Sequence, residues 1–346
     1  MKPRIAIPEG DPGGIGPEVA LQSLASPAVR ATLSPLLVGH QQTFMQVAER
    51  LDLPLTFISV ESAEEGFALA ADHPRSGGAD NPLPVLELEA PVPTEPLGQP
   101  AASFGLASVE AVLRAGALCK GGIADAMVTP PIHKESMHMA GYPYEGQTQI
   151  LGELSGGKGY GMLACNGNLK VLLATRHMAL RDAIERMEIT LVEKQLRVAH
   201  EAARRDLGLE NPRVALAGLN PHAGEGGAFG NEEKKILLPA IQRTKEAHGY
   251  ETAGPLVPDV IFAEGVRGDW DIIVALYHDQ AFIPLKLLGR EKAWTLLVGA
   301  DGILRTSPMH GAAYDIAGHA KADEAPFTFA LAKATELVQT KSLTSK

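Results

Sequence analysis

The chain has 346 residues, of which 45% are hydrophobic, and it carries a formal net charge of −10. This length exceeds what one simple hydrophobic core usually supports, so two domains are expected. An acidic chain of this kind is a poor partner for nucleic acid or an anionic membrane surface.

Short apolar runs alternate with helical patterns along the whole chain. The predicted strands are apolar throughout, as in parallel strands that are covered by helices on both faces. The sequence therefore predicts an α/β protein with a mainly parallel sheet. The Pro- and Gly-rich stretch 72–100 could be a linker, a hairpin arm or a surface loop. The predicted strands are 4–7, 35–39, 126–130, 170–175, 213–218 and 271–277, and the predicted helices are 17–24, 102–119, 181–208, 232–249 and 326–340.

The two cysteines, Cys119 and Cys165, lie far apart in the sequence and form no CxxC pair. A reducing compartment without disulfides is the simplest interpretation. The first residues contain no apolar run of signal-peptide length. We also expect no apolar stretch of about 18 residues, the length that crosses a bilayer, so no membrane span is expected. We therefore expect a cytoplasmic protein that contacts neither membrane nor nucleic acid.

Three histidines each follow a predicted strand: His177 after KVLLAT, His222 after RVALAG and His278 after DIIVALY. The carboxyl edge of a parallel sheet is where α/β proteins bind ligands. Neutral imidazole is the commonest ligand of divalent transition metals, so these residues are a candidate metal set. Asp259 and Asp279 are acidic neighbours that could bind the metal or orient its ligands. Any one of these histidines could instead cap a strand, and their shared position is what favours a metal.

A glycine-rich turn, EGDPGGIGPEV at 9–19, follows the first predicted strand and begins a helix. Such a turn can bring a phosphate or a cofactor close to backbone N–H groups. The pattern is neither GxGxxG nor a Walker loop, so no Rossmann domain is inferred. A tight turn without a ligand explains the spacing equally well.

Near the C-terminus, LRTSPMHGAAYDIAGH at 304–319 contains Arg305 and a histidine among small residues. Arginine can bind a carboxylate or phosphate with two parallel hydrogen bonds. Small residues admit a flat ligand, or simply pack helices closely. Lys134 and Lys286, in TPPIHK and IPLKLL, could bind an anion or transfer a proton, although most lysines are only solvated.

Six segments, in this order, resemble the 4-hydroxythreonine-4-phosphate dehydrogenase (PdxA) family: GDPGGIGPE, TPPIHK, ATRHMALRDA, GLNPHAGEGGAFGNEE, YHDQAFIPLK and RTSPMHGAAYDIAG. GLNPHAGEGG and YHDQ are highly specific, and the resemblance extends over nearly the whole chain. The family is similar in fold to the isocitrate and isopropylmalate dehydrogenases. That likeness implies two α/β domains with helices on both faces of their sheets and an active site in the interdomain cleft. We expect a cofactor-side domain of residues 1–130 and 287–346, and a metal, substrate and dimerisation domain of residues 131–286.

The resemblance implies a homodimer whose active sites are shared between subunits. A divalent metal (Zn, Ni, Co, Mn or Mg) would be held by His177 and His222 of one subunit and His278 of the other. Asp259 and Asp279 match acidic residues beside the metal.

The resemblance also implies roles for residues outside the metal set. Lys286 and Arg305 match residues that bind the anionic end of a small-molecule substrate, and Gln147 and Thr148 are expected beside it. Lys286 or Lys134 would move protons. NAD or NADP would bind along a segment that contains Gly14, His310, Gly311 and Asp315.

The implied reaction is oxidation of a secondary alcohol β to a carboxylate, with hydride transfer to NAD(P). The resulting β-keto acid would then lose carbon dioxide. The metal would polarise the alcohol oxygen and stabilise the enolate as a Lewis acid.

Three departures from the family pattern indicate a changed substrate. Gln147, in GQTQ, stands where members acting on the phosphorylated threonine carry the histidine of GHTE. Met309 replaces an aspartate, and the segment before Arg305 lacks an asparagine-containing NVTLGLP run. A branch of the family that oxidises carboxylated cis-dihydrodiols, such as terephthalate dihydrodiol, also departs at the first two positions, and we favour such a substrate. The alternatives are 4-phosphohydroxythreonine, in pyridoxal phosphate synthesis, and 4-phosphothreonate or phosphoerythronate, because Thr148 and Arg305 are kept.

Two further alternatives belong to other classes of protein. An inactive homologue that only binds a metal or ligand would reduce no nicotinamide, and the retained histidines, acids and Lys286 argue against it. A metallohydrolase could use a histidine-bound metal with an open position, but HGAAYDIAG would then need another explanation.

Overall fold

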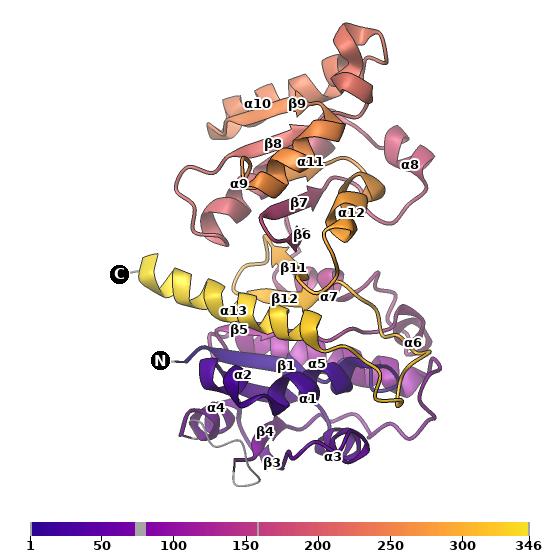
Figure 1. Cartoon of the computed structure of the whole chain (residues 1–346), viewed down its shortest axis with the longest axis vertical. Helices are drawn as coiled ribbons and strands as arrows, with labels where there is room; N and C mark the ends of the chain where they lie inside the picture. The colour runs from indigo at the N-terminus through magenta and orange to yellow at the C-terminus, as the bar shows by residue number, and fades with distance from the viewer. Residues whose placement is uncertain (1, 73–80, 158, 345–346) are drawn as a thin grey trace. The chain divides into compact units, whose positions relative to one another are not determined.

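The computed structural model describes residues 2–72, 81–157 and 159–344 (Figure 1). The chain divides into two compact units. The first, Met1–Lys158 with Ala300–Lys346, is called the N-terminal unit, and the second, Gly159–Gly299, is called the inserted unit. Each is described by itself.

The N-terminal unit contains a parallel sheet in the order β3-β4-β2-β1-β5-β12. Helices cover both faces: in Figure 1, α13 lies in front of β5 and α5 lies behind β1. The strands are β1 (Arg4–Pro8), β2 (Ser34–Val38), β3 (Phe57–Val60), β4 (Leu83–Leu86), β5 (Ala126–Val128) and β12 (Arg305–Pro308). The helices are α1 (Gly16–Ala25), α2 (Pro27–Thr32), α3 (Gln41–Arg50), α4 (Ala63–Asp72), α5 (Ala102–Lys120), α6 (Lys134–Met139), α7 (Gln147–Leu154) and α13 (Ala325–Thr344).

The inserted unit contains a mixed sheet in the order β11-β6-β7-β10-β8-β9. The pairs from β7 to β9 are parallel, whereas β6 runs antiparallel to β7 and β11. The strands are β6 (Gly161–Asn166), β7 (Leu169–Leu173), β8 (Val214–Ala217), β9 (Thr252–Leu256), β10 (Ile272–Ala275) and β11 (Ala293–Val298). The helices are α8 (Leu180–Glu185), α9 (Ile189–Arg205), α10 (Leu238–His248), α11 (Pro258–Arg267) and α12 (His278–Leu287), with the turns η1 (Pro221–Gly227) and η2 (Glu233–Leu237).

The predicted α/β class with mainly parallel strands is confirmed. Each predicted strand lies within two residues of an observed one. Strand β6 was not predicted, although Gly167-Asn168, which joins it to β7, is a typical two-residue hairpin loop. Strand β4 was also missed. It lies inside the Pro- and Gly-rich stretch and pairs with β2 and β3, so this stretch is more than a linker, while residues 73–80 lie outside the described part.

The boundaries between the two units differ from the expected ones. Residues 131–158 belong to the N-terminal unit because α6 and α7 pack on α5. Residues 287–299 belong to the inserted unit because β11 pairs with β6 along its whole length. These contacts join segments that are distant in sequence, so local patterns gave no sign of them.

The predicted helix 181–208 is divided into α8 and α9. Its buried side chains follow each other at a spacing of four from Ala183 to Met187 and then of five to Val192. A spacing of five shifts the apolar stripe around a helix of 3.6 residues per turn. A break in the helix at 186–188 lets the buried side chains on both sides of it face the core. Helix α9 then packs on β7, β8 and β10.

Helix α5 is the described helix that is long and apolar enough to cross a membrane by length and composition alone. The expectation that no such stretch exists is therefore wrong. Of its apolar window, 56% is buried within the structure, where α5 packs on β1, β2, β5, α6 and α7. A buried core helix passes the same test of length and composition.

A buried histidine gives the inserted unit a dependence on pH. His200 on α9 is 2% exposed, its Nε2 lies 2.9 Å from Thr252 Oγ1, and its ring stacks on Tyr250 at 4.8 Å between centroids. Burial, and secondarily the charge of Arg204, lowers the pKa of His200 to about 4. The ring is therefore neutral in the native state under conditions that protonate it in the unfolded chain.

We expect His200 to remove on the order of 3 kcal/mol of unfolding free energy as the pH falls from the ordinary value of 6.5 towards 4. In that window the unfolded state binds a proton that the native state does not, so the free energy of unfolding decreases as the pH decreases. Above that window His200 is neutral in both states. Urea unfolding at neutral pH and at about pH 5 measures the loss. The variant His200→Gln should show a smaller loss, whereas His248→Gln, an exposed histidine near the same tyrosine, should behave as wild type. An equal loss of unfolding free energy in wild type and His200→Gln would contradict this assignment.

Candidate active site

A buried guanidinium lies where β5 ends and β12 begins. Arg305 is 4% exposed; its Nε donates to Thr129 Oγ1 at 2.8 Å and its Nη2 donates to Gln147 Oε1 at 3.1 Å. Among the described residues both side-chain partners are neutral, and burial lowers the pKa of Arg305 to about 9. Burying a cation without a carboxylate is costly, so these residues form a candidate site for an anion. The predicted substrate residues Gln147 and Arg305 are thus brought together, and Thr148 follows on α7, half-buried.

The loop 310–318 is fixed against the glycine-rich turn after β1. Ile15 N donates to Ala312 O at 2.9 Å. A Cβ on Gly14 would lie 2.5 Å from the same carbonyl oxygen, so only glycine allows this approach. Gly14 therefore contacts protein, whereas a Cβ on Gly311 would meet nothing within 4 Å. Of the two predicted cofactor glycines, Gly311 has the open surface.

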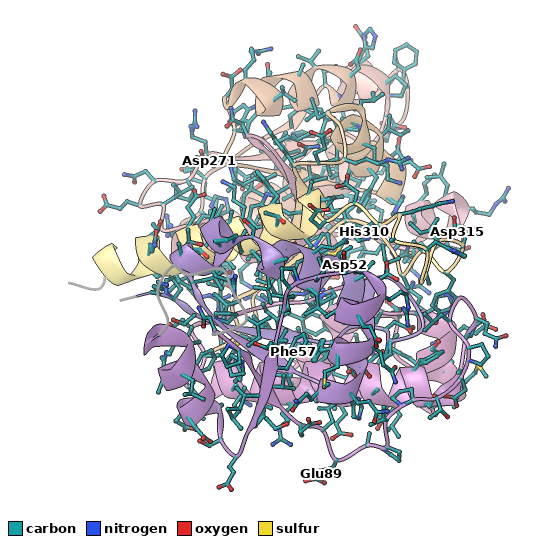
Figure 2. All side chains as sticks on the ribbon, turned by 60° about the horizontal axis from the view of Figure 1, so that its bottom comes forward. Asp52, Phe57, Glu89, Asp271, His310 and Asp315 are labelled. Carbon is teal, nitrogen blue, oxygen red and sulfur yellow. The ribbon has the colours of Figure 1, made fainter. Side chains whose placement is uncertain are left out.

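Two side chains in this loop are candidates for cofactor contacts (Figure 2). His310 is half-buried, and its Nδ1 lies 3.1 Å from Gly311 O. Its Nε2 is buried and has no hydrogen-bond partner in the described part of the chain. Burial lowers the pKa of His310. A buried ring nitrogen of this kind is expected to meet a ligand or a water molecule, and Asp315 is exposed on the same loop.

A second contact fixes the loop, through residues that the sequence analysis did not single out. Tyr314 Oη donates to Asp11 Oδ2 at 2.7 Å and lies 2.7 Å from Ser136 Oγ. The Asp11 Oδ1 atom accepts from Gly13 N at 2.8 Å, and the ring of His133 stacks on Tyr314 at 4.3 Å. An aspartate before Pro-Gly-Gly is typical of a turn in which the side chain accepts a backbone N–H, and that signal could have identified Asp11.

Two of the three predicted metal ligands meet in the inserted unit. His177 and His278 follow the parallel neighbours β7 and β10, and their ring centroids are 5.1 Å apart. Both line a hollow of about 390 Å³, together with Arg176, Tyr277 and Asp279. Nδ1 of His278 lies 2.7 Å from Asp279 Oδ1, which leaves Nε2 for a ligand.

His222 does not line this hollow. Its turn, η1, packs against α11, β9 and η2, and its Nδ1 lies 2.9 Å from Glu225 Oε2. No group of three His, Cys, Asp or Glu side chains able to hold a metal occurs within the described residues. The resemblance implies that His177 and His222 share a subunit; in the structure, the neighbour of His177 in the same chain is His278 instead.

The turn that carries His222 is left-handed. The five residues from His222 to Gly226 all have positive φ, including Ala223 at 51° and Glu225 at 41°. Non-glycine residues in this region cost on the order of 1 kcal/mol each, so other contacts must hold the turn. The buried carboxylate of Glu233 does so: its Oε1 accepts from the backbone N–H groups of residues 219 and 220 at 2.9 and 2.8 Å.

The remaining predicted residues are exposed. Lys286 lies on α12, with Nζ 5.8 Å from the ring centroid of Phe282, which stacks on His278 at 4.3 Å. Asp259 lies in the first turn of α11, and Lys134 is the first residue of α6. Neither is among the residues that line the hollow beside His177 and His278.

Comparisons with known proteins agree with this architecture. Residues 31–334 match the family described as "Pyridoxal phosphate biosynthetic protein PdxA". A 4-hydroxythreonine-4-phosphate dehydrogenase of Beijerinckia indica is 37% identical over 334 residues, covering 96% of this chain and 94% of the relative. A D-threonate 4-phosphate dehydrogenase of Cupriavidus necator is 37% identical over 337 residues, covering 97% of each.

Solved structures give the same picture. The 4-hydroxythreonine-4-phosphate dehydrogenase of Klebsiella pneumoniae has a TM-score of 0.84 at 33% identity, covering 98% of this chain and all of that chain (100%). A terephthalate 1,2-cis-dihydrodiol dehydrogenase of Burkholderia xenovorans has a TM-score of 0.62 at 30% identity, covering 99% of each.

These likenesses define an oxidoreductase that acts on a CH–OH group. Within that class, the chain belongs to the PdxA family, whose dehydrogenases depend in general on NAD and a divalent metal. The predicted family is confirmed. The preference for a dihydrodiol substrate is not: relatives named for phosphorylated threonine and threonate are more similar to this chain than the terephthalate enzyme is.

We expect Glu233→Ala to lower the free energy of unfolding by about 1–3 kcal/mol, because two partly buried N–H donors lose their acceptor. Zinc affinity should also fall, by roughly 10-fold or more, because the turn would no longer hold His222. Urea unfolding and zinc titration measure the two effects. Glu232→Ala is the matched control, since Glu232 accepts from the side-chain amide of Asn220 and not from the backbone N–H groups of residues 219 and 220. Equal losses in both variants would show that Glu233 does not hold the turn.

Proposed function

We propose that this protein oxidises the secondary hydroxyl of a phosphorylated hydroxy acid, of the 4-phosphohydroxythreonine or 4-phosphothreonate kind, with NAD or NADP as hydride acceptor. The observation that carries this proposal is the buried, uncompensated guanidinium of Arg305. Both relatives at 37% identity are named for substrates that combine a phosphate with an acid function. An anion that neutralises Arg305 would supply the missing partner.

Arg305 is suited to bind an oxyanion through two parallel hydrogen bonds. A guanidinium has five N–H donors, and the hydrogen bonds to Thr129 and Gln147 use two of them. The donors that remain can bind two oxygens of a phosphate or a carboxylate in parallel. Thr148, at the start of the same helix, has a hydroxyl for a further contact.

The donor set of the inserted unit fits a divalent transition metal. Two imidazoles stand side by side, and the carboxylate of Asp279 holds one of them by Nδ1, as carboxylates do behind metal-bound histidines. When bound, the metal would act as a Lewis acid on the substrate oxygen. Lys286 lies on the same helix face as His278, two turns away. We assign to Lys286 the role of accepting the proton that leaves the hydroxyl.

The nicotinamide cofactor is assigned to the loop 310–318. Gly311 is open to approach, and the buried Nε2 of His310 needs a partner. Docking of the loop on Asp11 and Ile15 makes it rigid before the cofactor arrives. A rigid site reduces the conformational entropy that is lost on binding.

We also propose that two copies of the chain complete the metal site. Apolar side chains flank the hollow beside His177: Leu180 is 55% exposed and Ile184 44% on α8, while Ile283 is 58% and Leu287 81% on α12. Exposed apolar patches of this kind mark association surfaces. A second copy that covers these helices would supply the third imidazole, His222.

Loss of carbon dioxide after oxidation remains part of the proposal. Oxidation of a hydroxyl β to a carboxylate gives a β-keto acid, and cleavage of its carboxylate leaves an enolate. A cation near the enolate oxygen stabilises that charge.

A carboxylated cis-dihydrodiol is the second candidate substrate. Gln147 and Met309 stand where the resemblance expects a histidine and an aspartate, and the terephthalate enzyme shares the fold along 99% of the chain. The lower similarity of that enzyme ranks it behind the phosphorylated acids.

We expect NAD(P)H to form when the metal-loaded protein is given 4-phosphohydroxythreonine or 4-phosphothreonate, and not with terephthalate cis-dihydrodiol. The test is the absorbance of the reduced nicotinamide, with each substrate offered to each cofactor. Arg305→Met should lower kcat/KM by roughly 100-fold or more, because its charged hydrogen bonds to the substrate are lost. Turnover of the dihydrodiol alone would overturn the proposed substrate class.

Mixing inactive variants tests the shared site. His222→Ala and His278→Ala chains, refolded together, should regain roughly a quarter of wild-type activity, because half of the dimers are mixed and each has one intact site. His177→Ala mixed with His278→Ala should regain none, because these ligands belong to one chain. Recovery in the second mixture would restore the division in which His177 and His222 share a subunit. No recovery in either mixture would contradict a shared site.

A further inference from the structure

The side-chain amide of Gln147 is engaged at both ends. Its Nε2 donates to Pro130 O at 2.8 Å, and its Oε1 accepts from Arg305 Nη2 at 3.1 Å. The residue is 7% exposed. Exchange of the amide oxygen and nitrogen would set a carbonyl against a carbonyl and an NH2 against the guanidinium. The orientation of this amide is therefore fixed by its two partners.

These contacts tie Arg305 to the strand that precedes it in the sheet. Thr129 and Pro130 directly follow β5. The backbone carbonyl of Pro130 holds Gln147, and the side chain of Thr129 holds the guanidinium of Arg305. The arginine side chain is long, and fixing it costs conformational entropy. Two hydrogen bonds from neutral groups fix it without reducing its charge.

We propose that Gln147 is a positioning residue for Arg305, and that it does not bind the substrate itself. Its neutrality keeps the full charge of the guanidinium available to an anion. This inference rests on the proposed function in one respect, namely that Arg305 binds the anionic group of the substrate. It corrects the expectation that Gln147 contacts the substrate.

The nature of the residue at this position then sets the strength of the anion site. A carboxylate in place of the amide would pair with Arg305 and compete with any ligand anion. An apolar side chain of the same length would leave Arg305 charged but free to move. The two replacements therefore have different effects on anion binding, although both remove the donor to Pro130.

A purely structural role makes a different prediction. If Gln147 only anchored the start of α7 to Pro130, loss of that hydrogen bond would lower stability similarly in both variants. Anion affinity would then not distinguish Gln147→Glu from Gln147→Met. Ligand affinity and thermal stability must therefore be measured on the same samples.

The experiment is isothermal titration calorimetry of the full chain with inorganic phosphate, repeated with terephthalate as an aromatic carboxylate. We expect Gln147→Glu to weaken binding on the order of 100-fold, because the guanidinium is already paired. Gln147→Met should weaken it by roughly 10-fold, because one fixing hydrogen bond is lost. The thermal midpoint of Gln147→Glu should be no lower than that of Gln147→Met, since the new carboxylate meets a buried cation.

Gln149→Glu is the matched control. It adds the same charge two residues along α7, where Gln149 is half-exposed and bonds Glu153 and the backbone of Glu145. Its affinity for either anion should stay within about twofold of wild type, because exposed charges are screened. A loss equal to that of Gln147→Glu would overturn the inference, since any added charge on α7 would then suffice.

The outcomes separate the two proposals. Binding by wild type with equal affinity in both Gln147 variants would overturn the positioning role and leave the anion site intact. Binding of terephthalate but not phosphate would overturn the phosphorylated substrate class, while the ratios between variants would still decide the role of Gln147. Absence of binding by wild type to either anion would overturn both.

Discussion

Parallel strand pairing is the constraint on which the functional groups of both units depend. In a parallel pair the carboxyl ends of both strands lie at the same edge, so residues that follow them become neighbours. His177 and His278 meet because Leu173 of β7 stands opposite Ala275 of β10. An antiparallel pairing would have put them at opposite edges. In the N-terminal unit the parallel register places Arg305, the first residue of β12, beside Met127 of β5, and its side chain reaches Thr129, which follows β5.

Two buried charged sites in the N-terminal unit differ in whether the protein supplies a counter-ion. Glu9 and His40 are both almost fully buried, and they face each other at 3.1 Å. Although burial opposes it, the hydrogen bond to Glu9 raises the pKa of His40 to about 9. The fold thus provides a counter-ion where a charge is structural. Arg305 has none within the described residues, and that contrast indicates a ligand as its partner.

Close packing and backbone strain occur beside the candidate groups. The glycine-rich turn after β1 allows the loop 310–318 to approach within hydrogen-bond distance, which an alanine at Gly14 would prevent. The left-handed turn at His222 is held by a buried carboxylate in addition to its own backbone hydrogen bonds. The second feature stores an unfavourable backbone conformation that the surrounding contacts offset. Strain of this kind is common where a side chain or loop must be presented to a ligand.

Local patterns determined the fold class, the position of the predicted strands and the presence of three histidines after strands of the same sheet. Apolar runs and turn residues act over a few positions, so they can be recognised in the sequence itself. Which histidines meet was decided by the tertiary structure, because η1 packs away towards β9 and α11. The partner of Gln147 was also decided there, since Arg305 lies 158 positions along the chain. Contacts over such separations depend on how strands align and helices pack, and no local pattern specifies them.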